Sequence, residues 1–152
     1  MIVTFQNIKR SHILLMDLEF DNMFLIQAAG LIFKMIDEKQ FKYQLQTSFN
    51  FYIKRDKVGR YAEKITGINP QFLNDNGIAL EEFLEQYEDI MKDVDLDNTL
   101  FVSHGSKNDR MVLKAAGIDK LPAHSFCTYK NASKILKRSS NLSLSGIAKE
   151  AG

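Results

Sequence analysis

The sequence has few cysteines, few prolines and no long hydrophobic run. Its single cysteine, Cys127, excludes an intramolecular disulfide, and no signal peptide is evident, so we expect the chain to work in a reducing cytosol. The apolar run after Lys9 and Arg10 covers only residues 13–16, which is too short for a signal-peptide core or a membrane span. We therefore predict a cytoplasmic protein with no membrane partner.

The composition also excludes several architectures. Two prolines and eight glycines leave no room for a low-complexity linker, and the sequence contains no internal repeat. The 20 basic and 19 acidic residues nearly cancel, so any charge-based function must come from local clusters. A chain of 152 residues, 45% of them hydrophobic, suits one domain with a proper core, and we predict a single domain over residues 1–152.

The hydrophobic pattern predicts a sheet in the first third of the chain. An apolar run at residues 12–18 predicts a central strand covered on both faces. Residues 24–34 predict a second strand, in which Gly30 marks a bulge or a close approach. Alternation over residues 41–53 predicts an antiparallel strand whose odd-numbered positions share one buried face. Together these strands predict a three-stranded meander.

The rest of the chain predicts helices that alternate with shorter strands. Apolar residues at helical spacing predict helices at residues 61–66, 80–93, 106–116, 128–136 and 142–151. Residues 99–103 and 125–127 predict two further strands, and Ser106 is expected to cap the helix that follows the first of them. This order of elements predicts an α/β domain with a mixed five-stranded sheet and flanking helices.

The first predicted strand ends in carboxylates. Asp17 and Glu19 are two residues apart, so both side chains point to the same face of a strand. Two converging carboxylates repel each other unless a cation lies between them, and carboxylate oxygens suit hard cations such as Mg²⁺ or Mn²⁺. A solvated strand end is the alternative for this short motif, and we expect Asp21, which lies outside the motif, to be a plain solvated loop residue.

A third acid follows the strand at residues 99–103. Asp109 lies at the start of the next helix, and neighbouring strand ends of an α/β sheet are where sites gather. The alternative is local, because Ser106 and Asp109 have the spacing of a capping box and a first-turn acid suits the helix dipole. Taken together, however, three acids from two strand ends are typical of two-metal sites that cleave phosphodiesters.

Four segments in this order resemble the motifs of the DEDD superfamily of 3′→5′ exonucleases, in its proofreading-subunit and RNase T-like group. The segments are ILLMDLEF, KITGINPQFL, LFVSHGSKNDRMVLKAAGI and NLSLSGIAKEAG. The first ends in the family's Asp-x-Glu, and the third places Asp109 at the family's next metal-binding position. The resemblance covers essentially the whole chain and implies a ribonuclease H-like fold.

The resemblance also implies a function. It implies a metal-dependent hydrolase that removes nucleotides from the 3′ end of single-stranded DNA or RNA. Asp17, Glu19 and Asp109 would be the catalytic residues and would hold two Mg²⁺ or Mn²⁺ ions. The implied substrate contacts are Phe20, Thr66, Ile68 and Asn108, although a core position for Phe20 is an equal alternative. A homodimer or a polymerase-type partner is left open.

The chain departs from the family in its third motif. That motif carries a His that acts as general base and a final Asp that completes the metal site, and the sequence ends at Gly152 before either. We therefore expect a shortened exonuclease with reduced or no activity, while a natural pseudo-enzyme or a second subunit that supplies the groups are alternatives. His104 lies at a strand end and is given little weight as a substitute, and we expect His124 on the surface.

Two functions of other classes compete with a nuclease. A haloacid-dehalogenase-type phosphatase also has an acid motif after an apolar strand, but it requires Asp-x-Asp, and Glu19 occupies the second place. A non-catalytic nucleic-acid-binding or interaction module of the same fold is the stronger rival, because of the missing third motif.

Overall fold

The fold is seen in a computed structural model of the chain, which describes residues 1–137 and 143–151. Six strands form one sheet: β1 (Ile2–Thr4), β2 (His12–Asp21), β3 (Phe24–Asp37), β4 (Lys42–Tyr52), β5 (Thr99–Ser103) and β6 (His124–Cys127). Their order across the sheet is β1-β4-β3-β2-β5-β6. The pairs among β1 to β4 are antiparallel, whereas β2, β5 and β6 run parallel.

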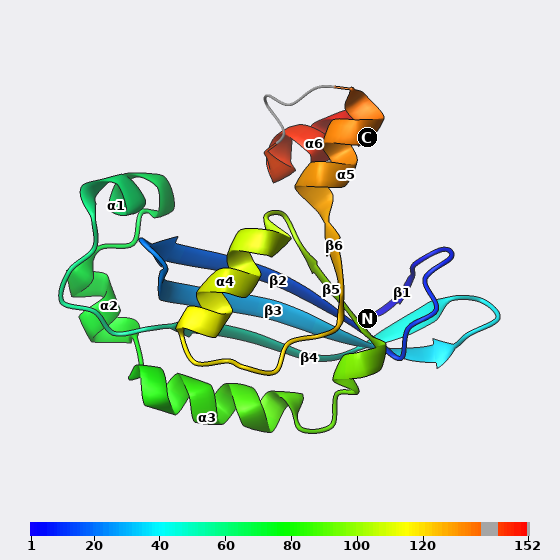
Figure 1. The fold of residues 1–152 in the computed structure, drawn as a ribbon, viewed down its shortest axis with the longest axis horizontal. Coiled ribbons are helices and arrows are strands. Elements are labelled where there is room, and N and C mark those ends of the chain that lie inside the picture. The colour runs from blue at the N-terminus through cyan, green and yellow to red at the C-terminus, as the bar shows by residue number, and fades with distance from the viewer. Residues whose placement is uncertain (138–142, 152) are drawn as a thin grey trace.

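Helices fill the connections between and after the strands (Figure 1). They are α1 (Arg60–Thr66), α2 (Pro70–Asn76), α3 (Leu80–Met91), α4 (Ser106–Ala115), α5 (Thr128–Leu136) and α6 (Leu144–Ala151), with a short 3-10 helix at Leu96–Asn98. The predicted helices therefore form close to their predicted bounds. Leu142 of the last predicted helix, and Asn141 and Gly152 of the last family-like segment, lie outside the described residues. None of the described helices is long and apolar enough to cross a membrane.

The mixed sheet that the sequence predicts is present, but it has six strands rather than five. The additional strand, β1, covers only three residues and pairs with β4 at the edge of the sheet, with Ile2 opposite Gln44. Three residues are too few to show the alternation of buried and exposed side chains that marks a strand, and Ile2 is exposed. No sequence pattern therefore predicts β1.

The main core lies between the sheet and the helices α3 and α4. Alternate residues of β2 enter it together with fully buried aromatic and aliphatic residues of the helices and β5; its members include Leu14, Ile32, Phe83, Phe101 and Val112. Figure 1 shows α4 crossing the sheet and α3 running along its β4 edge. The amphipathic pattern of α3 explains this position, because its apolar stripe faces the core and its acidic residues face solvent.

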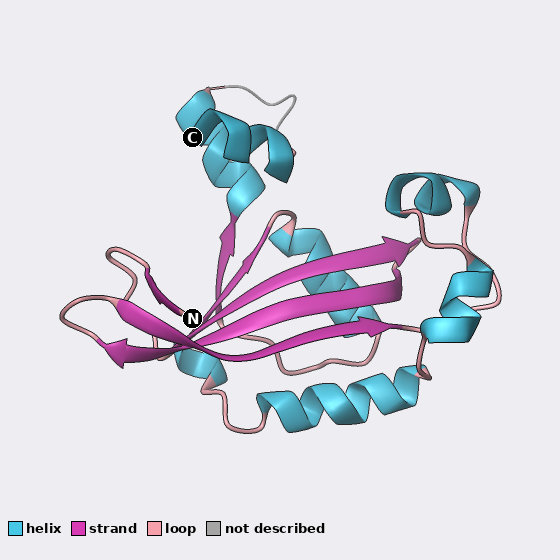
Figure 2. Ribbon diagram, turned by 180° about the vertical axis from the view of Figure 1, so that it is seen from behind, coloured by secondary structure: helices cyan, strands magenta, loops and turns pink. Residues whose placement is uncertain are grey.

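The opposite face of the sheet is more open. It carries a smaller cluster centred on Ile13, Phe33 and Tyr43, over which the segment between β1 and β2 folds. Seen from behind, the central strands β2, β3 and β4 have no described helix lying flat across them (Figure 2). A cavity lies on this open face, lined by residues of β2, β3 and β4 among others.

One prediction about β4 is wrong in detail. Its odd-numbered residues are the more buried ones, as predicted, but they do not share one face, because Tyr43 belongs to the open-face cluster and Phe49 to the main core. The register shifts between β3 and β4 where Ile32 and Phe33 face Thr47 and Leu45. One extra residue in β4 at this bulge moves the odd-numbered positions from one face to the other.

Gly30 marks a close approach, as its place inside a strand predicts. It pairs with Phe49 across β3 and β4, and the aromatic ring lies over the glycine. A Cβ atom at position 30 would come within 2.4 Å of Phe49 Cζ, a distance that real side chains do not tolerate. Glycine is therefore required here because the ring occupies the space of a side chain.

Candidate functional site

Asp17 and Glu19 lie on β2, where they pair with Ala29 and Gln27 of β3. Both side chains leave the face opposite to Leu18, which is buried in the main core between them. Asp17 is exposed and Glu19 is half-buried. The register of β2 and β3 shifts directly after Glu19, so a bulge ends the regular strand at the carboxylates.

Asp109 reaches the same region from α4. Strand β5 runs parallel to β2, and the turn after Ser103 leads directly into α4, whose first turn carries Asp109. The side chain is 8% exposed. The predicted cap at Ser106 is wrong: Gly105 is the N-cap, it lacks a side-chain cap, and Ser106 is a buried first residue of the helix. A Ser106 capping box therefore does not account for Asp109.

The three carboxylates influence one another electrostatically. Burial raises the pKa of the Glu19 carboxyl, and the negative charges of Asp17 and Asp109 raise it further. Burial also raises the pKa of Asp109, and the charge of Asp17 adds to this rise. The Ser103 hydroxyl and the Gly105 backbone lie beside Asp109 and partly oppose the rise. The side chains of two separate elements thus form one acidic cluster, Asp17, Glu19 and Asp109.

This acidic cluster has the donor chemistry of a hard-cation site. Within the described part of the chain, no three His, Cys, Asp or Glu side chains are arranged so that they could hold a metal ion by themselves. Mg²⁺, however, commonly binds through one or two carboxylates and takes its other ligands from water and substrate phosphates. The carboxylate oxygens of the acidic cluster are therefore the type of ligand that Mg²⁺ prefers, and its remaining ligands would come from outside the cluster.

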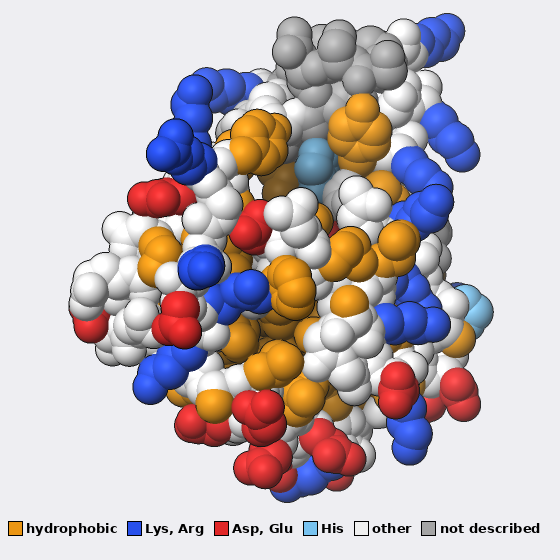
Figure 3. Space-filling view, turned by 60° about the vertical axis from the view of Figure 1, so that its left-hand side comes forward, with side chains coloured by type: hydrophobic (Ala, Val, Ile, Leu, Met, Phe, Trp, Pro, Cys, Tyr) orange, Lys and Arg blue, Asp and Glu red, His pale blue; other side chains and the backbone are white. Residues whose placement is uncertain are grey.

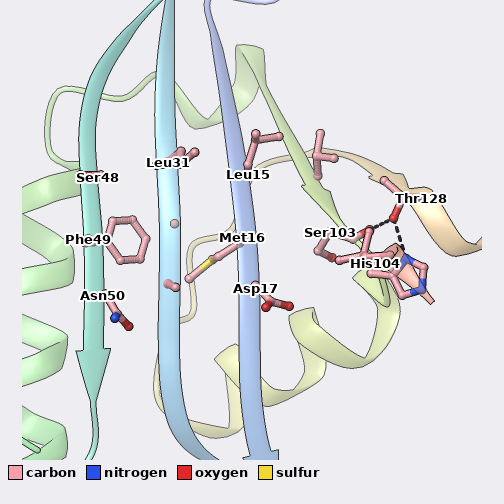
Figure 4. Close-up of a pocket in the computed structure, with 14 residues that line it drawn as sticks. Leu15, Met16, Asp17, Leu31, Ser48, Phe49, Asn50, Ser103, His104 and Thr128 are labelled. Atoms are coloured by element: carbon pink, nitrogen blue, oxygen red, sulfur yellow. Dashed lines mark hydrogen bonds between the residues drawn. The ribbon is translucent and has the colours of Figure 1, made fainter. Parts of the chain in front are cut away.

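A cavity of about 600 Å³ opens beside the acidic cluster, on the open face of the sheet. It is lined by backbone and side chains of β2 to β5, the start of α5 and Leu144 of α6; its polar members are Asp17, Ser48, Asn50, Ser103, His104 and Thr128. The close-up shows Asp17 pointing from β2 toward the end of β5, where Ser103 and His104 lie (Figure 4). The space-filling view shows a hollow with acidic, hydrophobic and histidine side chains at its border (Figure 3).

The predicted substrate contacts lie outside this cavity. Phe20 packs against the main core, and Ile68 is buried with Ile26 and Leu73 in a third cluster. Asn108 is exposed on the first turn of α4. As substrate contacts, these residues remain predictions.

Thr66 shapes the turn that ends α1. Its hydroxyl donates to the Ala62 carbonyl at 2.9 Å and accepts from the Ile68 N–H at 3.1 Å. Gly67 follows with a φ of 73°, the left-handed conformation that ends a helix, so α1 ends at Thr66, the last residue of the predicted range 61–66. A role of Thr66 toward substrate also remains a prediction.

Sequence reasoning underestimates or misses three polar residues: His104 and Thr128, which line the cavity, and Asp21 at the end of β2. The sequence gives His104 little weight, and it predicts Thr128, the hydrogen-bond partner of His104 at 2.9 Å, only as the first residue of the helix at residues 128–136. Asp21 is not a solvated loop residue, because it is half-buried and accepts a hydrogen bond from the Gly59 N–H. These partners are 24 and 38 positions apart in the sequence, so no local pattern could have identified them.

Comparison with known proteins gives a family. The sequence model of the RNase T family, described as exonuclease, matches residues 21–152, which is most of the chain. Asp17 and Glu19 lie just before the matched segment. No curated protein sequence matches the chain.

Solved structures of exonuclease I share the fold. E. coli exonuclease I in complex with a dA16 oligonucleotide has a TM-score of 0.64 and 16% identity, over 84% of this chain and 30% of that chain. The ExoI/SSB-Ct complex has a TM-score of 0.64 and 16% identity, over 89% of this chain and 32% of that one. A product-bound exonuclease I gives a TM-score of 0.63 at 17% identity, over 89% of this chain and 34% of that one.

These likenesses settle the architecture. The chain spans about a third of the length of the exonuclease I chains, and at this identity the similarity establishes the fold alone. The shared fold confirms the predicted ribonuclease H-like arrangement of a mixed sheet with flanking helices. Together with the family match over most of its length, it shows that the protein belongs to the RNase T-type exonuclease family, within the DEDD superfamily of 3′→5′ exonucleases.

Proposed function

We propose that this chain is a metal-dependent 3′→5′ exonuclease that removes nucleotides from the end of single-stranded DNA or RNA. One observation carries the proposal: beside an open cavity, the charge of Asp17 on β2 helps to raise the pKa values of Glu19 and of Asp109 on α4, and the charge of Asp109 also raises the pKa of Glu19. Acidic side chains that repel one another in this way are poised to receive a cation. The E. coli exonuclease I structure holds a dA16 oligonucleotide, which supports a single-stranded substrate.

In this proposal the acidic cluster holds the divalent ions, Mg²⁺ or Mn²⁺. When bound, such ions supply an activated water and stabilise the charge of the leaving oxygen. The buried position of Asp109 keeps its carboxylate fixed by α4, whereas exposed Asp17 stays open to water and substrate. The cavity beside Asp17 accommodates the terminal nucleotide, with Asn50 and Ser48 on β4 as polar groups at its wall.

A second candidate is a non-catalytic nucleic-acid-binding module of the same fold. It is favoured by the arrangement of the described acids, no three of which could hold a metal ion by themselves. A module of this kind would bind a single strand in the cavity without shortening it. The two candidates therefore differ in whether a shortened strand is produced, which a nuclease assay detects directly.

A nuclease assay with labels at either end separates the candidates. With Mn²⁺, a 5′-labelled single strand should shorten one nucleotide at a time, and a 3′-labelled strand should release its label as a mononucleotide at once. Asp17→Asn should abolish both results while a Ca²⁺ or EDTA gel-shift assay still detects binding. Binding without shortening in the parent protein would favour the module, and neither binding nor shortening would contradict both candidates.

A further inference from the structure

Charge is unevenly distributed over the surface of the molecule. Residues 80–98 are strongly acidic, with Lys92 as their one basic residue. From residue 99 to residue 137 the balance is reversed. The acids there are Asp109, which is buried, and Asp119, whereas the basic residues are Lys107, Arg110, Lys114, Lys120, Lys130, Lys134 and Lys137. Figure 3 shows Lys and Arg side chains along the right-hand border, beside the hollow. This side of the molecule therefore suits an anionic partner.

Three of these cations form a lysine stripe on α5, made of Lys130, Lys134 and the C-cap residue Lys137. They are four and three positions apart, so they lie on the same side of the helix and extend over about 10 Å of its axis. All three are exposed, and within residues 1–137 and 143–151 none of them forms an ion pair. Regularly spaced cations without carboxylate partners fit a chain of regularly spaced phosphates.

The lysine stripe begins at the cavity beside the acidic cluster. Thr128, the first residue of α5, lines this cavity together with His104. Tyr129 comes next, and its ring meets the His104 ring edge to face at 5.6 Å between centroids while staying 39% exposed. Lys130 follows, and successive helical residues are about 100° apart around the axis. The first turn of α5 therefore leads from the cavity, over an aromatic ring, to the first lysine.

A second exposed aromatic residue lies at the same border. Phe126 of β6 pairs with Val102 of β5, which lines the cavity, and its side chain is 41% exposed. Exposed rings next to a row of cations are typical of surfaces that bind single-stranded nucleic acids, because bases stack on the rings while the backbone follows the positive charge. An acidic protein segment would use the lysines alone. The two rings therefore favour a nucleic acid as the partner.

From this arrangement we propose that the lysine stripe, with Tyr129 and Phe126, binds the part of a single-stranded nucleic acid that lies outside the cavity. The inference deepens the proposed exonuclease function and rests on it for the direction of the strand. The 3′-terminal nucleotide occupies the cavity, and the nucleotides before it pass over Tyr129 to the lysines. Their bases stack on the rings, and their phosphates contact the ammonium groups. Contacts of this kind do not depend on sequence.

Binding in EDTA tests the surface without cleavage. Fluorescence anisotropy would compare labelled oligothymidylates of about 4 and about 20 nucleotides, lengths that fill the cavity alone or reach beyond it. The triple variant Lys130→Gln, Lys134→Gln, Lys137→Gln should bind the long strand roughly 10–100-fold more weakly at about 0.1 M salt. The slope of log K against log salt should become shallower by about 2, since each phosphate contact contributes about 0.7. Binding of the short strand should change by less than about threefold, because it does not reach the lysines.

Two further triple variants control for charge and folding. Substitution of Lys9, Lys34 and Lys39 by Gln removes the same charge from exposed positions at the opposite end of β2 and β3, and it should keep both affinities. Substitution of the three stripe lysines by Arg keeps the charge and should keep the affinity for the long strand. This second control separates lost phosphate contacts from lost folding.

The aromatic part of the surface is tested separately. Tyr129→Ala should weaken binding of the long strand by roughly 5–100-fold, the usual contribution of one stacked base, whereas Tyr129→Phe keeps the ring and should bind like the parent. Polyglutamate of matched charge should displace the long strand at least about tenfold less effectively than unlabelled oligothymidylate. Equal displacement by polyglutamate would overturn the assignment to nucleic acid and indicate an acidic protein segment instead.

The outcomes also separate this inference from the proposed function. If the stripe variant bound the long strand like the parent, or lost no more affinity than the control at Lys9, Lys34 and Lys39, the binding surface would be wrong. The exonuclease proposal would then still be judged by its own assay. If the stripe variant lost affinity for the long strand while the parent shortened no strand, the binding surface would stand and the exonuclease proposal would be contradicted.

Discussion

The carboxylate of Asp21 accepts a hydrogen bond of 2.8 Å from the backbone N–H of Gly59, across 38 positions of the sequence. The contact joins the end of β2, two residues after Glu19, to the residue that precedes α1. It is close, because a Cβ atom at Gly59 would lie 2.9 Å from Asp21 Oδ1. The strand that carries Asp17 and Glu19 is thereby tied to the helix that Thr66 ends.

Removal of this tie should loosen α1. Asp21→Ala is expected to lower the free energy of unfolding by about 1–2 kcal/mol, because it deletes the charged acceptor of a half-buried backbone N–H. Asp21→Asn keeps an acceptor oxygen and should lose less than half as much. Urea unfolding measures both, and an Asp21→Ala variant as stable as the parent would show that the contact contributes nothing.

Two buried tyrosines should respond to the same substitution in opposite ways. The Tyr43 hydroxyl accepts from the Arg10 N–H at 3.2 Å and lies 2.8 Å and 2.9 Å from the carbonyl oxygens of Ile8 and Arg10. The Tyr87 hydroxyl is buried without a hydrogen-bond partner among the described residues, and burial raises the pKa of Tyr87 to about 12. The Tyr43 hydroxyl therefore binds the backbone of the segment before β2, whereas the Tyr87 hydroxyl forms no hydrogen bond with the described residues.

Tyr43→Phe should therefore cost about 1–2 kcal/mol, since it leaves backbone groups of that segment unpaired. Tyr87→Phe should be neutral or stabilising, because it removes a buried hydroxyl that gains no compensating bond. Denaturant unfolding of the two single variants gives the comparison directly. Equal losses from both would contradict the assigned hydrogen bonding.

The contact between Gly30 and Phe49 predicts a coupled pair. Gly30→Ala should destabilise the fold by about 1–3 kcal/mol, because its Cβ atom would overlap the Phe49 ring. In the Phe49→Leu background the same change should cost clearly less, so the double variant is not the sum of the singles. If the stability losses of Gly30→Ala and Phe49→Leu were additive, the Phe49 ring would not be in contact with Gly30.

Mutual repulsion in the acidic cluster predicts a pH dependence without metal. Folding raises the pKa values of Glu19 and Asp109, so the folded state holds protons more tightly, and the free energy of unfolding falls as pH rises through those raised values. Asp17→Asn removes one repelling charge and should make this fall smaller. At neutral pH in EDTA it should stabilise the protein by less than about 1 kcal/mol, because Asp17 is exposed.

Urea unfolding at acidic and neutral pH measures this effect. Asp119→Asn removes an exposed charge from the loop after α4 and is the matched control, with no change expected in the pH dependence. If Asp17→Asn and Asp119→Asn behaved alike, the three carboxylates would not share one electrostatic environment.

The sequence predicts the strands and helices well because their patterns are local. The run before Asp17, the alternation over β4 and the stripe of α3 each show their period within one element. What it misses depends on pairing between distant segments. The face switch within β4 comes from one extra residue opposite β3, and β1 has too few residues to show any period.

The candidate site also has a part that the sequence predicts and a part that depends on pairing between distant segments. Asp17, Glu19 and Asp109 stand at strand and helix ends that the pattern identifies, so their meeting follows from the order of the elements. The partnership of His104 with Thr128 depends on the register of β5 and β6, which the short segment at residues 124–127 does not reveal. The sequence therefore predicts the acids but not the histidine beside them.

The central claim is that the acidic cluster binds a divalent cation, and a Mn²⁺ titration of the melting temperature tests it most directly. At a concentration about 100 times the dissociation constant, binding to the folded state adds about 2.7 kcal/mol. For a domain of this size that corresponds to a rise of roughly 5–10 °C. We predict this rise for the parent protein and a much smaller one for Asp17→Asn, Glu19→Gln and Asp109→Asn. No rise in the parent, or an equal rise in all three variants, would contradict the account.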